Sequence, residues 1–177
     1  MIELTKDRLE EARFFLGQLR QHKAREAKPN KPPPEHFRYY LNAFLNAAQG
    51  VTWVLKKEEP KKYKAWIGSW KAQRAEAEAA LRALMKDMRH TSVHEGRIKT
   101  TIRSEEVPII VAPPSPYQVH ALRAHALSLR QSGGPWTSSD VHYVQLNGSE
   151  QEVVAACEQH LDHLTKLVQD FVDKHPK

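Results

Sequence analysis

Apolar residues recur at alternating three- and four-residue spacing near the end of the chain, and this periodicity constrains the fold most. The repeating positions are Val153, Cys157, Leu161, Leu164, Val168 and Phe171. Side chains at these spacings share one face of an α-helix. The segment therefore predicts an amphipathic helix that buries this face against other helices. Ser149 and Glu152 have the spacing of a capping box, so we expect the helix to begin at Ser149.

Three earlier segments carry the same helical pattern. We expect helices over residues 4–25 and 34–57, separated by a proline-rich loop, and a third helical region over 61–95 with a bend near Gly68. Gly96 is suited to ending that region. The apolar stripe of the second helix is wider than one neighbour requires. Together with the stripe of the last helix, it could supply a dimer interface.

The pattern changes after residue 96. Ile98, Thr100 and Ile102 alternate with polar residues, as in a half-buried strand. Further strands are expected over 107–111 and 141–146, and between them a helix that starts at Ser115 and Pro116 and ends at Gly133. We therefore predict a mainly α protein, a four-helix bundle with a small α/β or β excursion between helices three and four. Residues 1–177 form one domain in this interpretation, and residues 97–147 are an insertion within it.

Composition indicates the cellular compartment and the kind of partner. The chain has 27 Lys and Arg against 21 Asp and Glu, a net charge of +6, which favours phosphate-rich partners. Its one cysteine excludes an internal disulfide and is typical of a reducing compartment. No apolar run is long enough to span a membrane, and the first residues do not resemble a signal peptide. We therefore expect a cytoplasmic protein that has no contact with a membrane.

The end of the third helical region carries the residues best suited to chemistry. Arg89 is followed at once by the polar His90, and His94 lies five residues after the arginine. This arrangement resembles the HEPN superfamily (higher eukaryotes and prokaryotes nucleotide-binding domains), whose signature is an arginine, four to six residues and a histidine. Asn is common in the family directly after the arginine, and His90 departs from that but keeps the polarity. The resemblance covers the helical parts, about 4–96 and 149–175.

The resemblance implies RNA cleavage that needs no metal or other cofactor. The 2′-hydroxyl of RNA attacks the neighbouring phosphate, His94 transfers a proton, and the guanidinium of Arg89 holds phosphate oxygens, with His90 in support. We expect the flanking Lys86, Arg97 and Lys99 to contact the RNA.

The resemblance also implies a homodimer. Five residues of helix turn about 500°, so Arg89 and His94 point about 140° apart on a straight helix. They converge only if the helix unwinds or if two copies of the motif meet, as they do in HEPN ribonucleases. Such enzymes occur in bacterial toxin–antitoxin, antiphage and stress systems, which makes a cognate antitoxin protein a further possible partner.

Other interpretations of these residues stay open. Arg89 could pair with Asp87 or Glu95 while His94 caps the helix, which would make the motif structural. The chain would then be a non-catalytic helical module that binds protein or nucleic acid. A metal site is a further alternative, because His90 and His94 share a helix face and the last helix holds another histidine pair, His160 and His163.

Two more groups carry both a binding and a structural interpretation. Trp66 and Trp70 lie among lysines and could stack on bases, although their four-residue spacing is more typical of a core. The basic segment from Arg20 to Arg38 could contact phosphates or serve only as a linker. Cys157 lies within the apolar repeat and is interpreted as a core residue.

Overall fold

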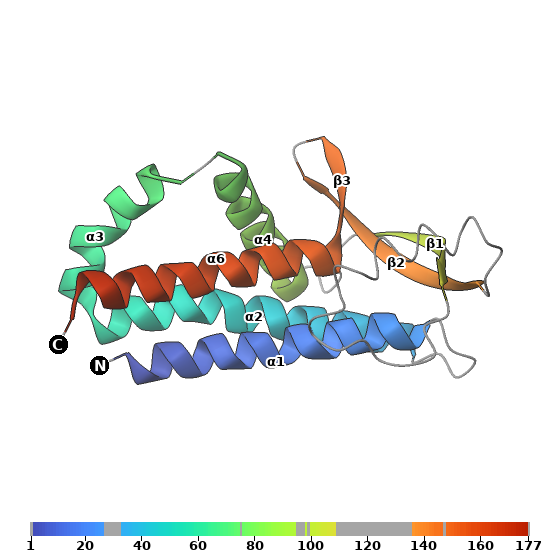
Figure 1. The fold of residues 1–177 in the computed structure, drawn as a ribbon, viewed down its shortest axis with the longest axis horizontal. Coiled ribbons are helices and arrows are strands. Elements are labelled where there is room, and N and C mark those ends of the chain that lie inside the picture. The colour runs from blue at the N-terminus through green and yellow to red at the C-terminus, as the bar shows by residue number, and fades with distance from the viewer. Residues whose placement is uncertain are drawn as a thin grey trace.

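The protein is mainly helical, with a small three-stranded antiparallel sheet at one end (Figure 1). The computed structural model describes residues 2–26, 33–74, 76–94, 98, 100–108, 136–146 and 148–176. Its helices are α1 (Glu3–Glu26), α2 (Pro34–Glu58), α3 (Pro60–Ala72), α4 (Glu76–His94) and α6 (Val153–Lys174). Its strands are β1 (Thr101–Pro108), β2 (Trp136–Leu146) and β3 (Ser149–Glu152). None of the described helices is both long enough and apolar enough to cross a membrane.

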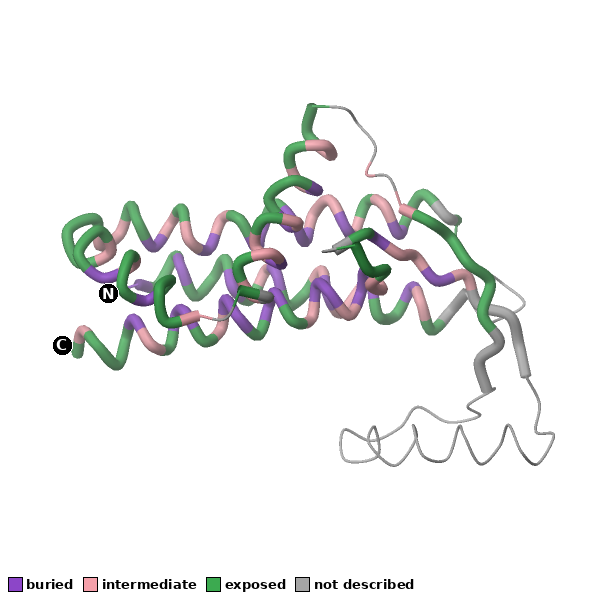
Figure 2. The backbone as a smooth tube through the Cα atoms, turned by 90° about the horizontal axis from the view of Figure 1, so that it is seen from above, coloured by how far each residue is buried: buried purple, intermediate pink, exposed green. Residues whose placement is uncertain are grey.

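Three long helices, α1, α2 and α6, lie side by side, and α3 and α4 form an arch beside them (Figure 1). The inward faces of the long helices make the core, with Leu16, Phe44, Val51 and Leu164 almost completely buried. This packing confirms the predicted helices over 4–25 and 34–57. The apolar stripes of α2 and α6, which could have supplied a dimer interface, are largely buried within this one chain (Figure 2).

The third predicted helical region is two helices. The chain breaks between Ala72 and Glu76, whereas Gly68 lies inside an uninterrupted α3. Packing decides the position of the break, since Trp66 and Trp70 are buried and fix α3 against α6. A single glycine costs a helix only about 1 kcal/mol, which such packing outweighs.

The sheet has the order β1-β2-β3. Strand β2 pairs with β1 from Thr101↔Tyr143 to Pro108↔Trp136, and with β3 from Tyr143↔Glu152 to Leu146↔Ser149. The strand predicted over 141–146 is therefore confirmed as part of β2. One described strand, β1, overlaps both strands predicted around Ile98 and over 107–111. Residues 109–111, and the helix predicted between Ser115 and Gly133, lie outside the described residues.

The predicted capping box at the start of the last helix is wrong. Ser149 and Glu152 bound strand β3, and α6 begins only at Val153. The backbone of these four residues pairs with β2 across a tight turn, in which Gly148 has a positive φ of 76°. Pairing with β2 keeps these four residues in a strand, and Glu152, the residue before α6, makes no capping hydrogen bond through its side chain.

The sheet is attached to the helices by a few specific contacts. The ring of His142 on β2 stacks on Phe37 of α2, with centroids 3.8 Å apart, and its Nδ1 hydrogen-bonds with Thr100 Oγ1. Lys23 of α1 forms an ion pair with Glu152 of β3. Burial of the ring lowers the pKa of His142, because a charged imidazole would lose hydration there.

Candidate functional site

Helix α4 crosses from the α6 side of the molecule to the α2 side, and its last turns stand clear of the long helices (Figure 2). Leu81, Met85 and Met88 are buried and hold the helix in place. Glu76 and Glu78 lie in its first turn and the basic residue His94 in its last, an order that suits the helix dipole. The opposite face of α4 therefore faces solvent at the end that carries the motif.

The arginine and the two histidines of the motif lie apart and have different partners. Arg89 is partly buried, and its Nε donates a hydrogen bond to Asn46 Oδ1 of α2 at 3.1 Å. His90 and His94 are exposed on the other side of α4, with ring centroids 4.5 Å apart. The helix continues regularly to His94, so Arg89 and His94 do not converge within one chain.

Asn46 is a site residue that the sequence patterns did not indicate. It lies exposed on the outer face of α2, and only the crossing of α4 over α2 brings it to Arg89. If the motif were only structural, the expected partner of Arg89 was Asp87 or Glu95. Asp87 lies two residues away and points from another side of the helix, while Glu95 lies outside the described residues.

The structure describes one of the three residues expected to contact RNA. Lys86 is exposed on the same helix as the motif. Arg97 and Lys99 lie outside the described residues.

The histidine pairs do not combine into one metal site. His163 contacts Glu78, which lies 16 residues before His94, or about 24 Å along α4. Among the described residues, no group of three or more His, Cys, Asp and Glu side chains could hold a metal ion. His90 and His94 alone provide two ligands, fewer than a zinc site in a protein uses.

A buried polar cluster fastens α4 to α6. Arg82 Nη1 lies 3.0 Å from His163 Nε2, and Glu78 Oε2 lies 3.1 Å from His163 Nδ1. Because arginine can only donate, His163 Nε2 accepts, which requires a neutral imidazole with its proton on Nδ1. Burial and the nearby positive charge of Arg82 lower the pKa of His163, which also favours the neutral imidazole. Burial also lowers the pKa of the neighbouring His160 to about 4.

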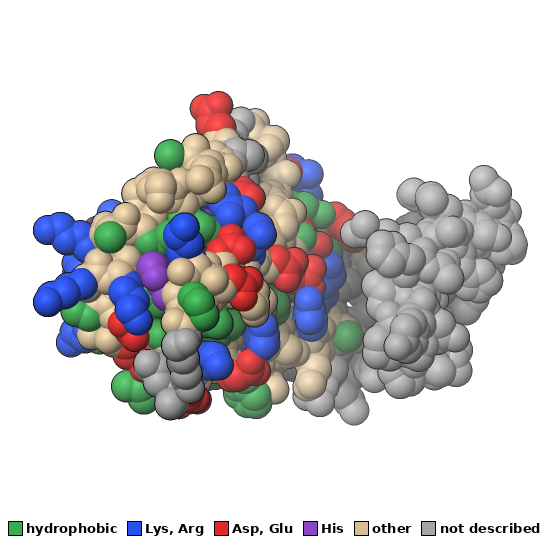
Figure 3. All heavy atoms as spheres, turned by 60° about the vertical axis from the view of Figure 1, so that its left-hand side comes forward, with side chains coloured by type: hydrophobic (Ala, Val, Ile, Leu, Met, Phe, Trp, Pro, Cys, Tyr) green, Lys and Arg blue, Asp and Glu red, His purple; other side chains and the backbone are tan. Residues whose placement is uncertain are grey.

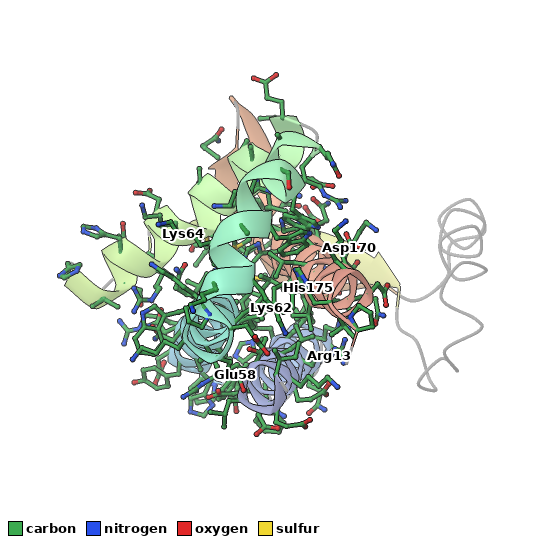
Figure 4. All side chains as sticks on the ribbon, turned by 90° about the vertical axis from the view of Figure 1, so that its left-hand side faces the viewer. Arg13, Glu58, Lys62, Lys64, Asp170 and His175 are labelled. Atoms are coloured by element: carbon green, nitrogen blue, oxygen red, sulfur yellow. The ribbon has the colours of Figure 1, made fainter. Side chains whose placement is uncertain are left out.

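A second set of polar contacts fastens α3 to α6. Trp70 Nε1 and Arg74 Nη2 both donate to Asp170 Oδ2, at 2.9 and 2.8 Å, and Arg74 lies over the Trp70 ring. Figure 4 shows Asp170 on the α6 side of the molecule. Trp66 and Trp70 are buried, which confirms their interpretation as core residues.

The basic residues at the start of the Arg20–Arg38 segment have structural partners. Arg20 pairs with Glu158 of α6 at 2.6 Å, and Lys23 pairs with Glu152. These contacts tie the end of α1 to α6 and to the sheet.

The motif thus occupies an exposed helix end supported by a packed core, with an acceptor from α2 orienting the arginine. Arg89 has four further N–H donors beyond the one given to Asn46, and both histidines are accessible to a ligand. No family model, curated protein or solved structure matches this chain.

Proposed function

We propose that this chain is a metal-independent endoribonuclease of the HEPN type, with Arg89, His94 and His90 in its active site. The observation that carries the proposal is the exposure of two histidines beside Arg89 on the projecting end of α4. Histidine side chains are common proton-transfer groups in catalysis, and a guanidinium binds phosphate oxygens in a forked geometry. The mainly helical fold agrees with a HEPN-like bundle.

The chemistry assigns each side chain a task. The 2′-oxygen attacks phosphorus as a histidine accepts its proton, and the 5′-oxygen leaves as it receives a proton. Arg89 stabilises the negative charge that gathers on the phosphate oxygens. The products are a 2′,3′-cyclic phosphate and a 5′-hydroxyl. DNA lacks the attacking hydroxyl, so it is not cleaved.

The active site requires a second copy of the chain. Arg89 and His94 point about 140° apart on a regular helix, so one copy cannot bring both to one phosphate. A homodimer in which two α4 ends meet would place Arg89 of one copy beside His94 of the other. We propose a toxin–antitoxin or antiphage setting, in which an antitoxin protein would cover this end of α4.

A binding module without catalysis is the second candidate. The observation that favours it is the hydrogen bond from Arg89 to Asn46, which engages the arginine away from the histidines. In that case α4 would present a basic surface to a protein or nucleic acid without transferring protons.

RNA cleavage by the purified protein in EDTA separates the two candidates. We expect wild type to produce 2′,3′-cyclic phosphate ends, and His94→Ala and Arg89→Ala to lose at least about 100-fold of the rate. Arg13→Ala is the matched control, because Arg13 lies exposed on the opposite side of the molecule (Figure 4). Cleavage that survives in both site variants, or that EDTA abolishes, would overturn the nuclease proposal.

A further inference from the structure

The outer face of α2 differs in chemistry from the rest of the surface. No Asp or Glu occurs between Glu35 and Glu58, a stretch that covers almost the whole helix. The exposed side chains of this stretch are aromatic, amide, basic or small. We call the exposed row formed by Tyr39, Asn46, Trp53 and Lys57 the α2 outer face.

Trp53 is the most unusual member of this face. Its side chain is 57% exposed, although its helix buries eight other apolar residues in the core. Lys57 Nζ lies 3.8 Å from the centroid of its ring, a cation–π contact that holds the two side chains together. An exposed indole beside an ammonium is the pair of groups that binds an unpaired base and its phosphate.

The face repeats this pairing and leads toward the motif. Tyr39 is 53% exposed, and the guanidinium carbon of Arg38 lies 5.4 Å from its ring centroid. Tyr39, Asn46 and Trp53 are seven residues apart and so lie in one row of about 21 Å. Asn46 in the middle of the row accepts the hydrogen bond from Arg89. The row therefore passes directly beside the proposed active site.

Neighbouring elements add positive charge on the same flank. Lys64 of the neighbouring helix α3 is exposed (Figure 4). Lys and Arg side chains project from the left-hand edge in Figure 3, where few acidic side chains lie among them.

We propose that the α2 outer face binds single-stranded RNA, with one base stacked on Trp53 and the adjacent phosphate on Lys57. This inference rests on the proposed function for its choice of RNA. Single strands are favoured because stacking on a side chain requires an unpaired base. A second copy fits less well, since a two-fold contact through this face would set its basic side chains against themselves.

Binding is tested in the His94→Ala background, so that RNA is not consumed. The probe is a fluorescein-labelled RNA of about 16 unpaired nucleotides, followed by anisotropy. We expect Trp53→Ala to weaken binding about 5- to 100-fold and Trp53→Phe to weaken it less. Lys57→Gln should lower the slope of log affinity against log salt by about 0.7, the loss of one phosphate contact.

Phe14→Ala is the matched control. Phe14 is an exposed aromatic of α1, 60% accessible, that lies off the α2 outer face. It should leave the affinity unchanged, and circular dichroism should show every variant folded. Affinity in Trp53→Ala equal to that of its parent would overturn the proposal. Loss of dimer in that variant with unchanged RNA affinity would also overturn it, and would assign the face to a second copy.

Cleavage by the wild-type protein is measured separately, so that the two proposals can fail independently. Trp53-dependent binding without cleavage would keep the RNA surface and reject the nuclease. Cleavage without a Trp53 effect on binding would keep the nuclease and reject the surface.

Discussion

Mixing two inactive variants tests whether the motif works across a dimer. In Arg89→Ala the histidines remain, and in His94→Ala the arginine remains. If Arg89 and His94 act from different copies, the mixed dimer contains one complete site and one site that lacks both residues. If they act within one copy, both sites of the mixed dimer are broken and no activity returns.

The structure sets the size of the expected recovery. Arg89 points toward Asn46 on α2, while His94 contacts His90 on another side of a regular helix. Every working site must then combine two copies. Random co-assembly makes half of the molecules mixed dimers with one working site of two, so we expect about a quarter of the wild-type rate.

The assay is the initial rate of RNA cleavage in EDTA, after co-expression of the two variants. Affinity purification through two different tags should raise the recovered rate to about half of wild type, because every dimer is then mixed. Co-expression of Arg89→Ala with the double variant Arg89→Ala/His94→Ala is the control and should stay inactive. A mixed dimer that forms but does not cleave, while wild type does, would refute the reasoning from the helix geometry.

Two further predictions concern stability. His160 has a pKa of about 4 when folded against an ordinary value of 6.5, so its contribution to stability is complete above about pH 6.5 and is lost as the pH falls toward 4. Urea unfolding should show a loss of about 2–3 kcal/mol between pH 7 and 4.5. His160→Gln should flatten this profile, and an unchanged profile would contradict the assignment. Gly17→Ala should raise the free energy of unfolding by about 0.5–1 kcal/mol, since a Cβ at Gly17 meets no atom within 4 Å; a lower urea midpoint would contradict this.

The helices were predictable from the sequence because their apolar spacing depends on local geometry alone. Competing local signals were harder to resolve. The spacing of Ser149 and Glu152 fits a helix cap, but the two residues pair with the neighbouring strand β2 instead. Gly68 looked like a break, yet the burial of Trp66 and Trp70 on both sides of it kept the helix intact.

The candidate site was predictable only in part for a related reason. The contact between His90 and His94 follows from their four-residue spacing within one helix. The partner of Arg89 depends on where α4 crosses α2, and no periodicity encodes that crossing. The same limit applies to the apolar stripe of α2, whose width reflects two neighbours, α1 and α6, within one chain.

The start of α1 is capped by a residue at the end of α2. Glu58, at the corner between α2 and α3, accepts hydrogen bonds from the backbone amides of Leu4 and Thr5 and from the Thr5 hydroxyl. First-turn amides of a helix have no partner within the helix and otherwise exchange rapidly with solvent. Their hydrogen exchange therefore reports the opening of the α2–α3 corner. We expect the beginning of α1 and this corner, 53 residues after Thr5 in the sequence, to open together.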